Sequence, residues 1–283
     1  MNFICLEFNQ SLCIITYGRE IMKVATFNAN SIRTRLPIIC DWLTMHDPDI
    51  LGIQETKVQD KDFPSDAFVE LGYNVYFRGE KSYNGVAILS KKEAQNIQYG
   101  FDDGGPIDDT RLIRASFGNI EVINTYIPQG RAIDHVMYKY KLNWYKRIRS
   151  LFDKYYSPDQ SIVWLGDMNI AIEPIDVHQP KTKMNDPCYH QDAKDAFIHA
   201  CDFGFTDLLR THRAKDVLYS FFDYRVKDAV DRNIGWRIDY ILSTKSLLER
   251  CKDCFIDIEP RRKEKPSDHT FVIAEFCELN SNN

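Results

Sequence analysis

The stretch Ser161-Ile-Val-Trp-Leu-Gly-Asp-Met-Asn169 decides the fold of this chain. Its first five residues, 161–165, predict a buried strand, which Gly166 is expected to end. Residues two apart on an extended backbone point to the same side, so Asp167 and Asn169 are expected to project together from the strand end. A carboxylate beside an apolar strand is costly without a partner, so this one needs a cation, a proton or hydrogen-bond donors.

A second stretch has the same form. Residues 23–27 predict a strand, and Asn28 and Asn30 follow it, again two apart. Two strand ends that each offer paired oxygen ligands indicate a hard metal ion and a negatively charged substrate. The rest of the chain is expected to bring these two ends together.

Length and composition indicate one ordinary globular domain. The chain has 283 residues, of which 44% are hydrophobic and 27% are charged. This length is near the upper size for one continuous core, and one domain is favoured over two stacked halves. The formal net charge of -5 argues against a protein that coats nucleic acid nonspecifically. It does not exclude a nuclease, because phosphate attraction depends on local basic clusters and on bound metal.

The cysteines and the chain ends indicate a cytoplasmic protein with no membrane partner. Only Cys251 and Cys254 of the eight cysteines have metal-type spacing, and no second pair completes a zinc site, so reduced thiols are expected. Residues 1–21 lack a basic leader and a run long enough to span a membrane. We therefore predict a non-structural extension over 1–21, a single catalytic domain over 22–277 and a disordered tail over 278–283.

The order of the predicted elements indicates the fold class. Helices are expected at 37–45, with Pro37 in the first turn, and at 137–155 and 192–202. Strands are expected at 23–27, 49–54, 72–77, 85–90, 112–117, 120–127, 161–165, 219–224, 237–242, 254–258 and 270–276. Strands in runs with few helices between them predict an α+β fold with two mostly antiparallel or mixed sheets and helices outside. The basic groups in the helix 137–155 are expected to form a solvated surface.

Few polar residues end or interrupt the strong strands. They are Asn28, Asn30, Glu55, Tyr126, Asp167, Asn169, Asp239, Asp268 and His269. Most of them have an ordinary structural explanation as a turn, a cap or an exposed charge. Asp239 is harder to explain, because it stands in the middle of the apolar segment 236–242 and needs a dedicated partner. His269 is a candidate for that partner.

Six motifs in this order resemble the exonuclease III family of abasic-site endonucleases, within the endonuclease/exonuclease/phosphatase superfamily. They are Phe27-Asn28-Ala-Asn30, Gln54-Glu55-Thr-Lys57, Asn124-x-Tyr126-x-Pro128-x-Gly130, Gly166-Asp167-Met-Asn169, Gly235-Trp-Arg-Ile-Asp239-Tyr and Ser267-Asp268-His269. The similarity runs from about Met22 to Phe276. The segments Phe222-Asp-Tyr-Arg225 and Glu264-Lys-Pro-Ser-Asp-His269 resemble the bacterial exonuclease III branch.

The resemblance implies a four-layer α/β sandwich, with two sheets face to face and the site at one edge. It implies a Mg²⁺-dependent hydrolase, with Mn²⁺ as a substitute, that acts as a monomer on double-stranded DNA with abasic sites or blocked 3′ ends. The implied reactions are cleavage 5′ to abasic sites, removal of 3′ blocking groups and 3′–5′ exonuclease action.

The resemblance also assigns roles around the metal. Glu55 would be the main metal carboxylate, and Asn28 or Asn30, with Asp268, would support one or a second ion. Asp167 would orient or deprotonate the attacking water. Asn169 would hold the phosphate, and any metal contact of this Asp–Asn pair would be secondary.

Further roles concern the substrate. Tyr126 would contact the phosphate or stabilise the leaving group. His269, aligned by Asp239, would donate to an oxygen of the scissile phosphate. The remaining contacts with DNA would come from Trp236, as a wall of the pocket for the baseless sugar, and from Arg131 and Lys57 near phosphates.

The chain departs from the family pattern in three places. Before the helix of the second half, Tyr189-His-Gln-Asp-Ala-Lys194 stands where members commonly have a Pro-rich segment with Glu-Arg, so the resemblance does not extend to DNA contacts from that loop. Ser31 stands where members usually have glycine, and Asn30 stands where some have aspartate, which leaves one charge fewer for a metal. Two other functions compete: a phosphoesterase of the same superfamily with a non-DNA substrate, and a noncatalytic binding module. Trp236 beside Arg237 favours DNA, because that segment is typical of the repair branch, and the complete set of site residues favours catalysis.

Overall fold

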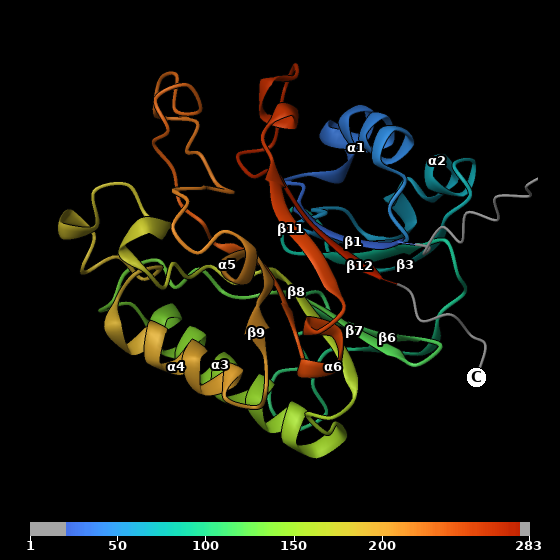
Figure 1. Ribbon diagram of the computed structural model, residues 1–283, viewed down its shortest axis with the longest axis horizontal. Helices are drawn as coiled ribbons and strands as arrows, with labels where there is room; N and C mark the ends of the chain where they lie inside the picture. The colour runs from blue at the N-terminus through green and yellow to red at the C-terminus, as the bar shows by residue number, and fades with distance from the viewer. Residues whose placement is uncertain (1–20, 278–283) are drawn as a thin grey trace, which may run out of the picture.

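The computed structural model describes residues 21–277. The predicted tail, 278–283, and residues 1–20 of the predicted extension lie outside the described residues. Ile21 is the first residue of β1 (Ile21–Asn28), so the strand begins one residue before the predicted domain boundary. The described chain forms two stacked sheets with helices on their outer faces (Figure 1). Within residues 21–277, no helix is both long enough and apolar enough to cross a membrane.

Each sheet has six strands and one central parallel pair. The first sheet has the order β11 (Cys251–Asp257), β12 (Phe271–Cys277), β1, β2 (Ile50–Gln54), β4 (Val86–Ser90) and β3 (Asn74–Arg78). The second has the order β5 (Gln95–Tyr99), β6 (Leu112–Phe117), β7 (Ile120–Tyr126), β8 (Ser161–Asp167), β10 (Asp239–Ser243) and β9 (Thr206–Asp207). Only β1–β2 and β7–β8 are parallel among these neighbours. The predicted α+β class with mixed sheets is confirmed.

Three apolar layers hold the sandwich together. The layer between the sheets joins Val24 and Ile88 of the first sheet to Val122 and Leu165 of the second. On the outer face of the first sheet lie α1 (Ile32–His46) and α2 (Ser65–Val69); on that of the second lie α3 (Val136–Tyr155) and α4 (Gln191–Cys201). The shorter helices are α5 (Leu208–His212), α6 (Lys245–Leu248) and the 3₁₀ turns Asp60–Asp62, Pro174–Asp176, Pro180–Thr182 and Glu259–Arg262.

The parallel pairs bring four strand ends to one edge of the sandwich. The strands β1, β2, β7 and β8 all run toward this edge, where they end at Asn28, Gln54, Tyr126 and Asp167. Asn124 ties the two sheets together just behind it. Its amide nitrogen donates to the Ile53 and Ala87 carbonyls at 3.1 and 2.8 Å, and its oxygen accepts from Gln54 at 2.7 Å. The edge is therefore fixed from both sheets.

Three local predictions are wrong. Residues 219–224 form no strand; Phe221 makes isolated bridges with Trp236 and His269 instead. Gly166 does not end β8, which continues to Asp167 because the glycine adopts a φ of 137°. Asp239 lies at the start of β10, not in the middle of a strand.

The first helix also begins earlier than predicted. Pro37 lies inside α1, which starts at Ile32. Tertiary hydrogen bonds fix this start, since the Ser31 and Ile32 amides donate to the Glu55 and Thr56 carbonyls at 2.8 and 3.0 Å. These hydrogen bonds join residues that are far apart in the sequence, so a local sequence pattern cannot predict them.

Candidate active site

Two carboxylates from different sheets meet at this edge. Glu55 follows β2 and Asp167 ends β8, and the Asn28 amide at the end of β1 donates to both, at 2.8 Å each. The Asn28 oxygen is held by the Asn30 backbone amide at 3.0 Å, which fixes the orientation of the side chain. The structure therefore joins the two predicted strand ends through one buried amide.

A polar chain extends from Glu55 along the first sheet. The Lys57 ammonium lies 2.7 Å from Glu55 Oε2 and donates to Asn30 Oδ1 at 2.5 Å. Asn30 in turn donates to Asp268 Oδ1 at 2.9 Å. Burial alone would raise the pKa of Glu55, but Lys57 and the Asn28 amide outweigh it and lower the pKa. Glu55 is therefore ionised and available as a ligand.

His269 lies between two aspartates. Its Nδ1 is 2.8 Å from Asp239 Oδ2, and its Nε2 is 3.9 Å from Asp167 Oδ2. Asp239 and Asp167 are directly paired across β10 and β8, so the sheet register sets this spacing. Burial lowers the pKa of His269, but Asp239 first, and then Asp167 and Asp268, raise it to about 10. A protonated imidazole with Nε2 directed at the cluster can donate a hydrogen bond to an anion.

The buried Asp167 carboxylate has two other carboxylates, Asp239 and Glu55, among the charges around it. Burial raises the pKa of Asp167 to about 8; His269 opposes this shift, whereas Asp239 and Glu55 add to it. Ligand atoms of Glu55, Asp167 and His269 lie within 4.8 Å of one another. Two carboxylates at one position are the oxygen donors that a hard divalent cation prefers, and such a cation would keep both ionised. These residues therefore fit a divalent metal ion.

Several residues of the predicted site have a left-handed backbone, as do other residues of the described chain. Five non-glycine residues of the predicted site have positive φ: Asn30 at 43°, Glu55 at 51°, Lys57 at 55°, Arg131 at 62° and Asn169 at 50°. Such conformations cost energy and persist only where surrounding contacts impose them. The contacts around these five residues therefore hold their backbones in these conformations.

Tyr126 borders the carboxylates on the side of the second sheet. Burial raises its pKa well above the ordinary value, and the nearby Glu55 and Asp167 raise it further. The Arg111 guanidinium stacks on the ring, 4.6 Å from its centroid, and donates to the Tyr126 carbonyl at 3.1 Å. The hydroxyl therefore stays protonated and can act as a donor.

Asn169 lies beside the cluster, and Arg131 lies on the surface. Asn169 has a left-handed backbone, with φ at 50°, and its side-chain amide donates to the Ile127 carbonyl at 2.9 Å. The extended backbone on which the Asp167–Asn169 prediction was based therefore ends at Asp167 and does not include Asn169. The Asn169 backbone amide donates to Asp167 Oδ1 at 2.9 Å. Arg131 is exposed, and its backbone amide donates to Gln129 at 2.6 Å.

Trp236 lies at the rim beside His269. It packs with Phe221 and Val177, and the Phe221 ring meets the His269 ring edge-on at 5.0 Å. The Lys183 ammonium lies 5.7 Å from the centroid of the indole. Aromatic surface is thus available next to the proton donor.

The burial of Lys141 was not expected from the sequence. The basic groups of α3 are not all solvated, since Lys141 is fully buried and Arg147 is nearly so. The signal was present in the helical period, because Lys141 lies three and four residues from the buried Tyr138 and Tyr145 and shares their face.

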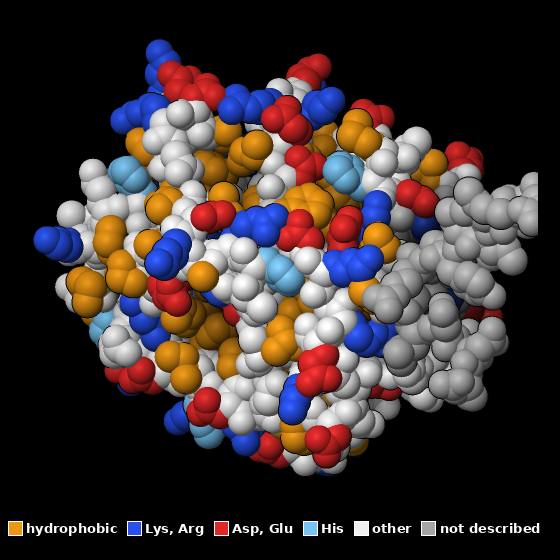
Figure 2. Space-filling view, in the orientation of Figure 1, with side chains coloured by type: hydrophobic (Ala, Val, Ile, Leu, Met, Phe, Trp, Pro, Cys, Tyr) orange, Lys and Arg blue, Asp and Glu red, His pale blue; other side chains and the backbone are white. Residues whose placement is uncertain are grey.

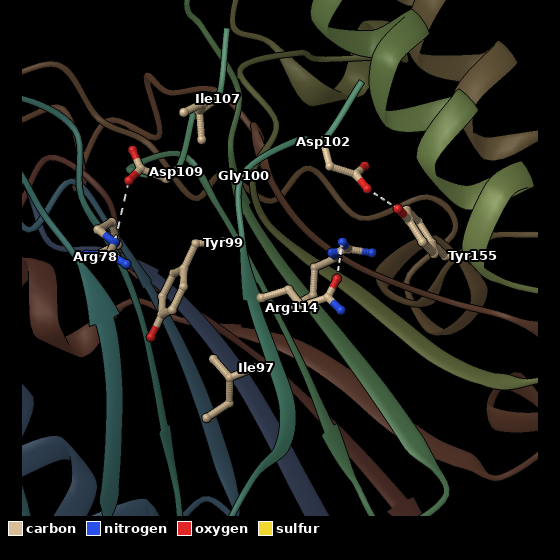
Figure 3. Close-up of a pocket in the computed structure, with 10 residues that line it drawn as sticks. Arg78, Ile97, Tyr99, Gly100, Asp102, Ile107, Asp109, Arg114 and Tyr155 are labelled. Carbon is tan, nitrogen blue, oxygen red and sulfur yellow. Dashed lines mark hydrogen bonds and ion pairs between the residues drawn. The ribbon is translucent and has the colours of Figure 1, made fainter. Parts of the chain in front are cut away.

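A hollow lies apart from this site, at the open edge of the second sheet (Figure 3). Its volume is about 490 Å³, and none of its lining residues belongs to the predicted site. Arg78 stacks on Tyr99 and Arg114 on Tyr155, each with 4.7 Å between the guanidinium carbon and the ring centroid. On the face shown in Figure 2, acidic and basic side chains are interspersed over the surface.

Known proteins are similar to this chain in sequence and in fold. The endonuclease/exonuclease/phosphatase family matches residues 25–269. The exodeoxyribonuclease III of Haemophilus influenzae is 34% identical over 267 residues, which cover 90% of this chain and 100% of that protein. An AP endonuclease from Archaeoglobus fulgidus is 49% identical, with a TM-score of 0.89 over 90% of this chain and 99% of its own. A 3′ phosphatase from Neisseria, solved with a product DNA hairpin, is 34% identical, with a TM-score of 0.82 over 90% and 99%.

Proposed function

Because the chain belongs to the endonuclease/exonuclease/phosphatase family, we propose that it is a metal-dependent DNA-repair phosphodiesterase. It cleaves DNA 5′ to abasic sites, removes blocking groups from 3′ ends and degrades duplex DNA as a 3′–5′ exonuclease. The names of its relatives, exodeoxyribonuclease III, AP endonuclease and 3′ phosphatase, support these activities. The observation that carries the proposal is the placement of His269 between Asp239 and Asp167, with Glu55 joined to Asp167 through Asn28.

Mg²⁺, with Mn²⁺ as a substitute, is the proposed cofactor. Glu55 is its principal ligand, and Asp167 and Asp268 face the same region. The side-chain amide of Asn28 or Asn30 would support the ion. That of Asn169 would hold the phosphate, with any metal contact secondary. When bound, a divalent ion stabilises the charge that develops on the nonbridging oxygens and on the departing 3′ oxygen.

The other steps of the reaction are assigned to individual side chains. Asp167, ionised, orients a water for in-line attack on phosphorus and accepts its proton. The bond between phosphorus and the 3′ oxygen then breaks, and the departing oxygen takes a proton from solvent, so the products carry a 3′ hydroxyl and a 5′ phosphate. His269, fixed by Asp239, donates a hydrogen bond from Nε2 to a nonbridging oxygen. Tyr126 donates to the phosphate, or to the leaving oxygen, from the opposite side.

Recognition of the lesion is assigned to the aromatic rim. A sugar without a base leaves a space that Trp236 can wall, and Lys57 and Arg131 would contact neighbouring phosphates. We propose double-stranded DNA as the partner, a monomeric enzyme and a cytoplasmic location. Free thiols at Cys40, Cys188, Cys201, Cys251, Cys254 and Cys277 are compatible with a reducing compartment.

Metal dependence provides the test of this proposal. The purified chain should cut a duplex with one abasic analogue when Mg²⁺ or Mn²⁺ is present, and a chelator should stop the reaction. Asp167→Asn and Glu55→Ala should abolish cutting, whereas the exposed Glu249→Ala should act like wild type. Cutting that survives chelation, or a hydrolysed soluble phosphoester with DNA left intact, would refute the proposal.

A further inference from the structure

A buried ammonium group lies behind the candidate site. Lys141 of α3 has no exposed surface, and its Nζ donates to three backbone carbonyls: Asn169 at 2.6 Å, Pro187 at 2.8 Å and Gln129 at 3.1 Å. An ammonium has three protons, so this one is fully satisfied by these partners. All three are neutral groups, and the thiol of Cys188 follows at 3.9 Å.

The three carbonyls belong to different segments that leave the active edge. Gln129 lies after β7, Asn169 after β8, and Pro187 in the segment that leads to α4. Lys141 therefore holds three separate pieces of backbone against one another. The segments also contact one another directly. The Asn169 side-chain amide donates to the Ile127 carbonyl at 2.9 Å, and the Ala171 backbone amide donates to the Cys188 carbonyl at 2.7 Å.

One of these bonds leads directly to the carboxylate. The Asn169 carbonyl accepts from Lys141, and the Asn169 backbone amide donates to Asp167 Oδ1 at 2.9 Å. Asn169 has a left-handed backbone, with φ at 50°, which its neighbours must impose. The ammonium thus fixes the residue whose amide orients Asp167.

Core stability alone does not explain a lysine at this position. Burial of a charge is costly, and an apolar side chain of similar length would fill the same space without that cost. Burial lowers the pKa of Lys141, against the opposing effects of Cys188, Asp167 and Asp186. A benefit to the catalytic geometry would offset this cost.

We propose that Lys141 is a positioning residue for hydrolysis, which holds Asp167 in its reactive orientation through the Asn169 backbone. This inference rests on the proposed function. It adds a residue outside the cluster of site residues, on a helix that covers the opposite face of the second sheet from β2 and Glu55. The catalytic groups and the metal ligands remain as described above.

The test compares two buried lysines. Lys141→Met removes the ammonium, and Lys194→Met in α4 is the matched control, because Lys194 is also buried but its Nζ lies 3.1 Å from the centroid of the Tyr189 ring. We expect Lys141→Met to lower kcat on the abasic duplex by about 10–100-fold, as loss of a supporting contact does. KM should change by less than about threefold, since substrate contacts remain. Lys194→Met should retain kcat.

A second readout does not depend on activity. Amide hydrogen exchange in Lys141→Met should rise together in segments 127–131, 168–170 and 186–189, while strands β7 and β8 stay protected. If Lys141→Met does not fold, Lys141→Gln, which keeps two donors without the charge, replaces it with the same expectations. Unchanged kcat, an equal loss in Lys194→Met, or exchange that rises throughout the domain would overturn the inference. An inactive wild type would instead refute the proposed function, and exchange would then decide the role of Lys141.

Discussion

The His269 imidazole is enclosed by defined partners on several sides. It is 4% exposed, its Nδ1 faces Asp239, and Phe221 covers its ring. With a carboxylate on Nδ1, the proton on Nε2 is directed at Asp167 and the space beside it. Asp239 thus sets both the orientation and the charge of the ring.

Replacing Asp239 with asparagine should disturb the orientation of the His269 imidazole without weakening DNA binding. In Asp239→Asn the imidazole loses its carboxylate partner, so we expect kcat to fall by at least about 100-fold, as in other hydrolases whose histidine loses its aspartate. The Kd for an abasic duplex should change little, because Asp239 is buried and touches no solvent-facing surface. Single-turnover kinetics and a binding titration give the two values. Equal losses in both would contradict the orientation role.

The same variant should shift the pH profile of the reaction. Asp239 is the main group that raises the pKa of His269, to about 10, against the effect of burial. The charged donor is present below this pKa and is lost as the pH rises through it. In Asp239→Asn the pKa is lower, so the alkaline fall in kcat should begin at a lower pH than in wild type. An unmoved alkaline limb would argue that another group controls it.

Trp236 allows a test of lesion recognition. Its ring packs on Phe221 at the rim of the site, where a sugar without a base would be received. Trp236→Ala should therefore reduce incision at an abasic analogue more than exonuclease action on a recessed undamaged duplex. Rates on the two substrates, measured with one enzyme preparation, give the ratio. The pocket role fails if both rates fall by the same factor.

At the scale of elements, β8 determines where Asp167 stands. Gly166 has a φ of 137°, and a Cβ added there would lie 2.0 Å from the Thr125 carbonyl oxygen of β7. Only glycine lets the strand pass this close to its parallel neighbour and still pair Asp167 with Tyr126. The residue that was expected to end the strand instead allows it to reach the edge.

Gly166→Ala should therefore damage stability and activity together. The backbone strain and the clash should lower the free energy of unfolding by at least about 3 kcal/mol. Gly118→Ala is the control, because Gly118 also has a positive φ but no atom within 4 Å of an added Cβ; its loss should stay near 1–2 kcal/mol. Denaturant unfolding measures both variants. Similar losses in the two would contradict the close-approach argument.

Strands with regular apolar sequences were predictable. A largely polar strand, and a segment whose conformation depends on tertiary packing, were not. Regular apolar runs such as 86–90 and 112–117 lie in strands as expected. The edge strand β5 was missed because Gln95-Asn-Ile-Gln-Tyr99 is largely polar and its pairing is irregular. Residues 219–224 have the aromatic composition of a strand, but their rings fill two small clusters, around Phe222 and around Trp236, instead of a sheet.

The site was predictable as a set of strand ends, but its geometry was not. The motifs identified Glu55, Asp167 and His269, which the structure places together. The turn of Asn169 depends on a left-handed backbone and on the Ile127 carbonyl, which strand periodicity cannot reveal. Lys141 was missed because a lysine in a basic helix is usually solvated, and only the three carbonyls around it show otherwise.

At the scale of the whole molecule, the two stacked sheets have the same arrangement of strands. Each has a central parallel pair with antiparallel strands on both sides, and the four parallel strands end at one edge. Neither sheet alone has a complete site, because Glu55 comes from the first and Asp167 and Asp239 come from the second. The activity therefore depends on the packing of the two halves.

A product-length assay tests the central claim most directly. The substrates are a duplex with one abasic analogue and an undamaged duplex with a recessed 3′ end, each incubated with the purified chain and Mg²⁺. A metal-dependent DNA phosphodiesterase should cut the first once, directly 5′ to the analogue, and leave a 3′ hydroxyl; it should shorten the second stepwise from its 3′ end. A wild-type protein that leaves both duplexes intact with Mg²⁺ and with Mn²⁺ would contradict the account.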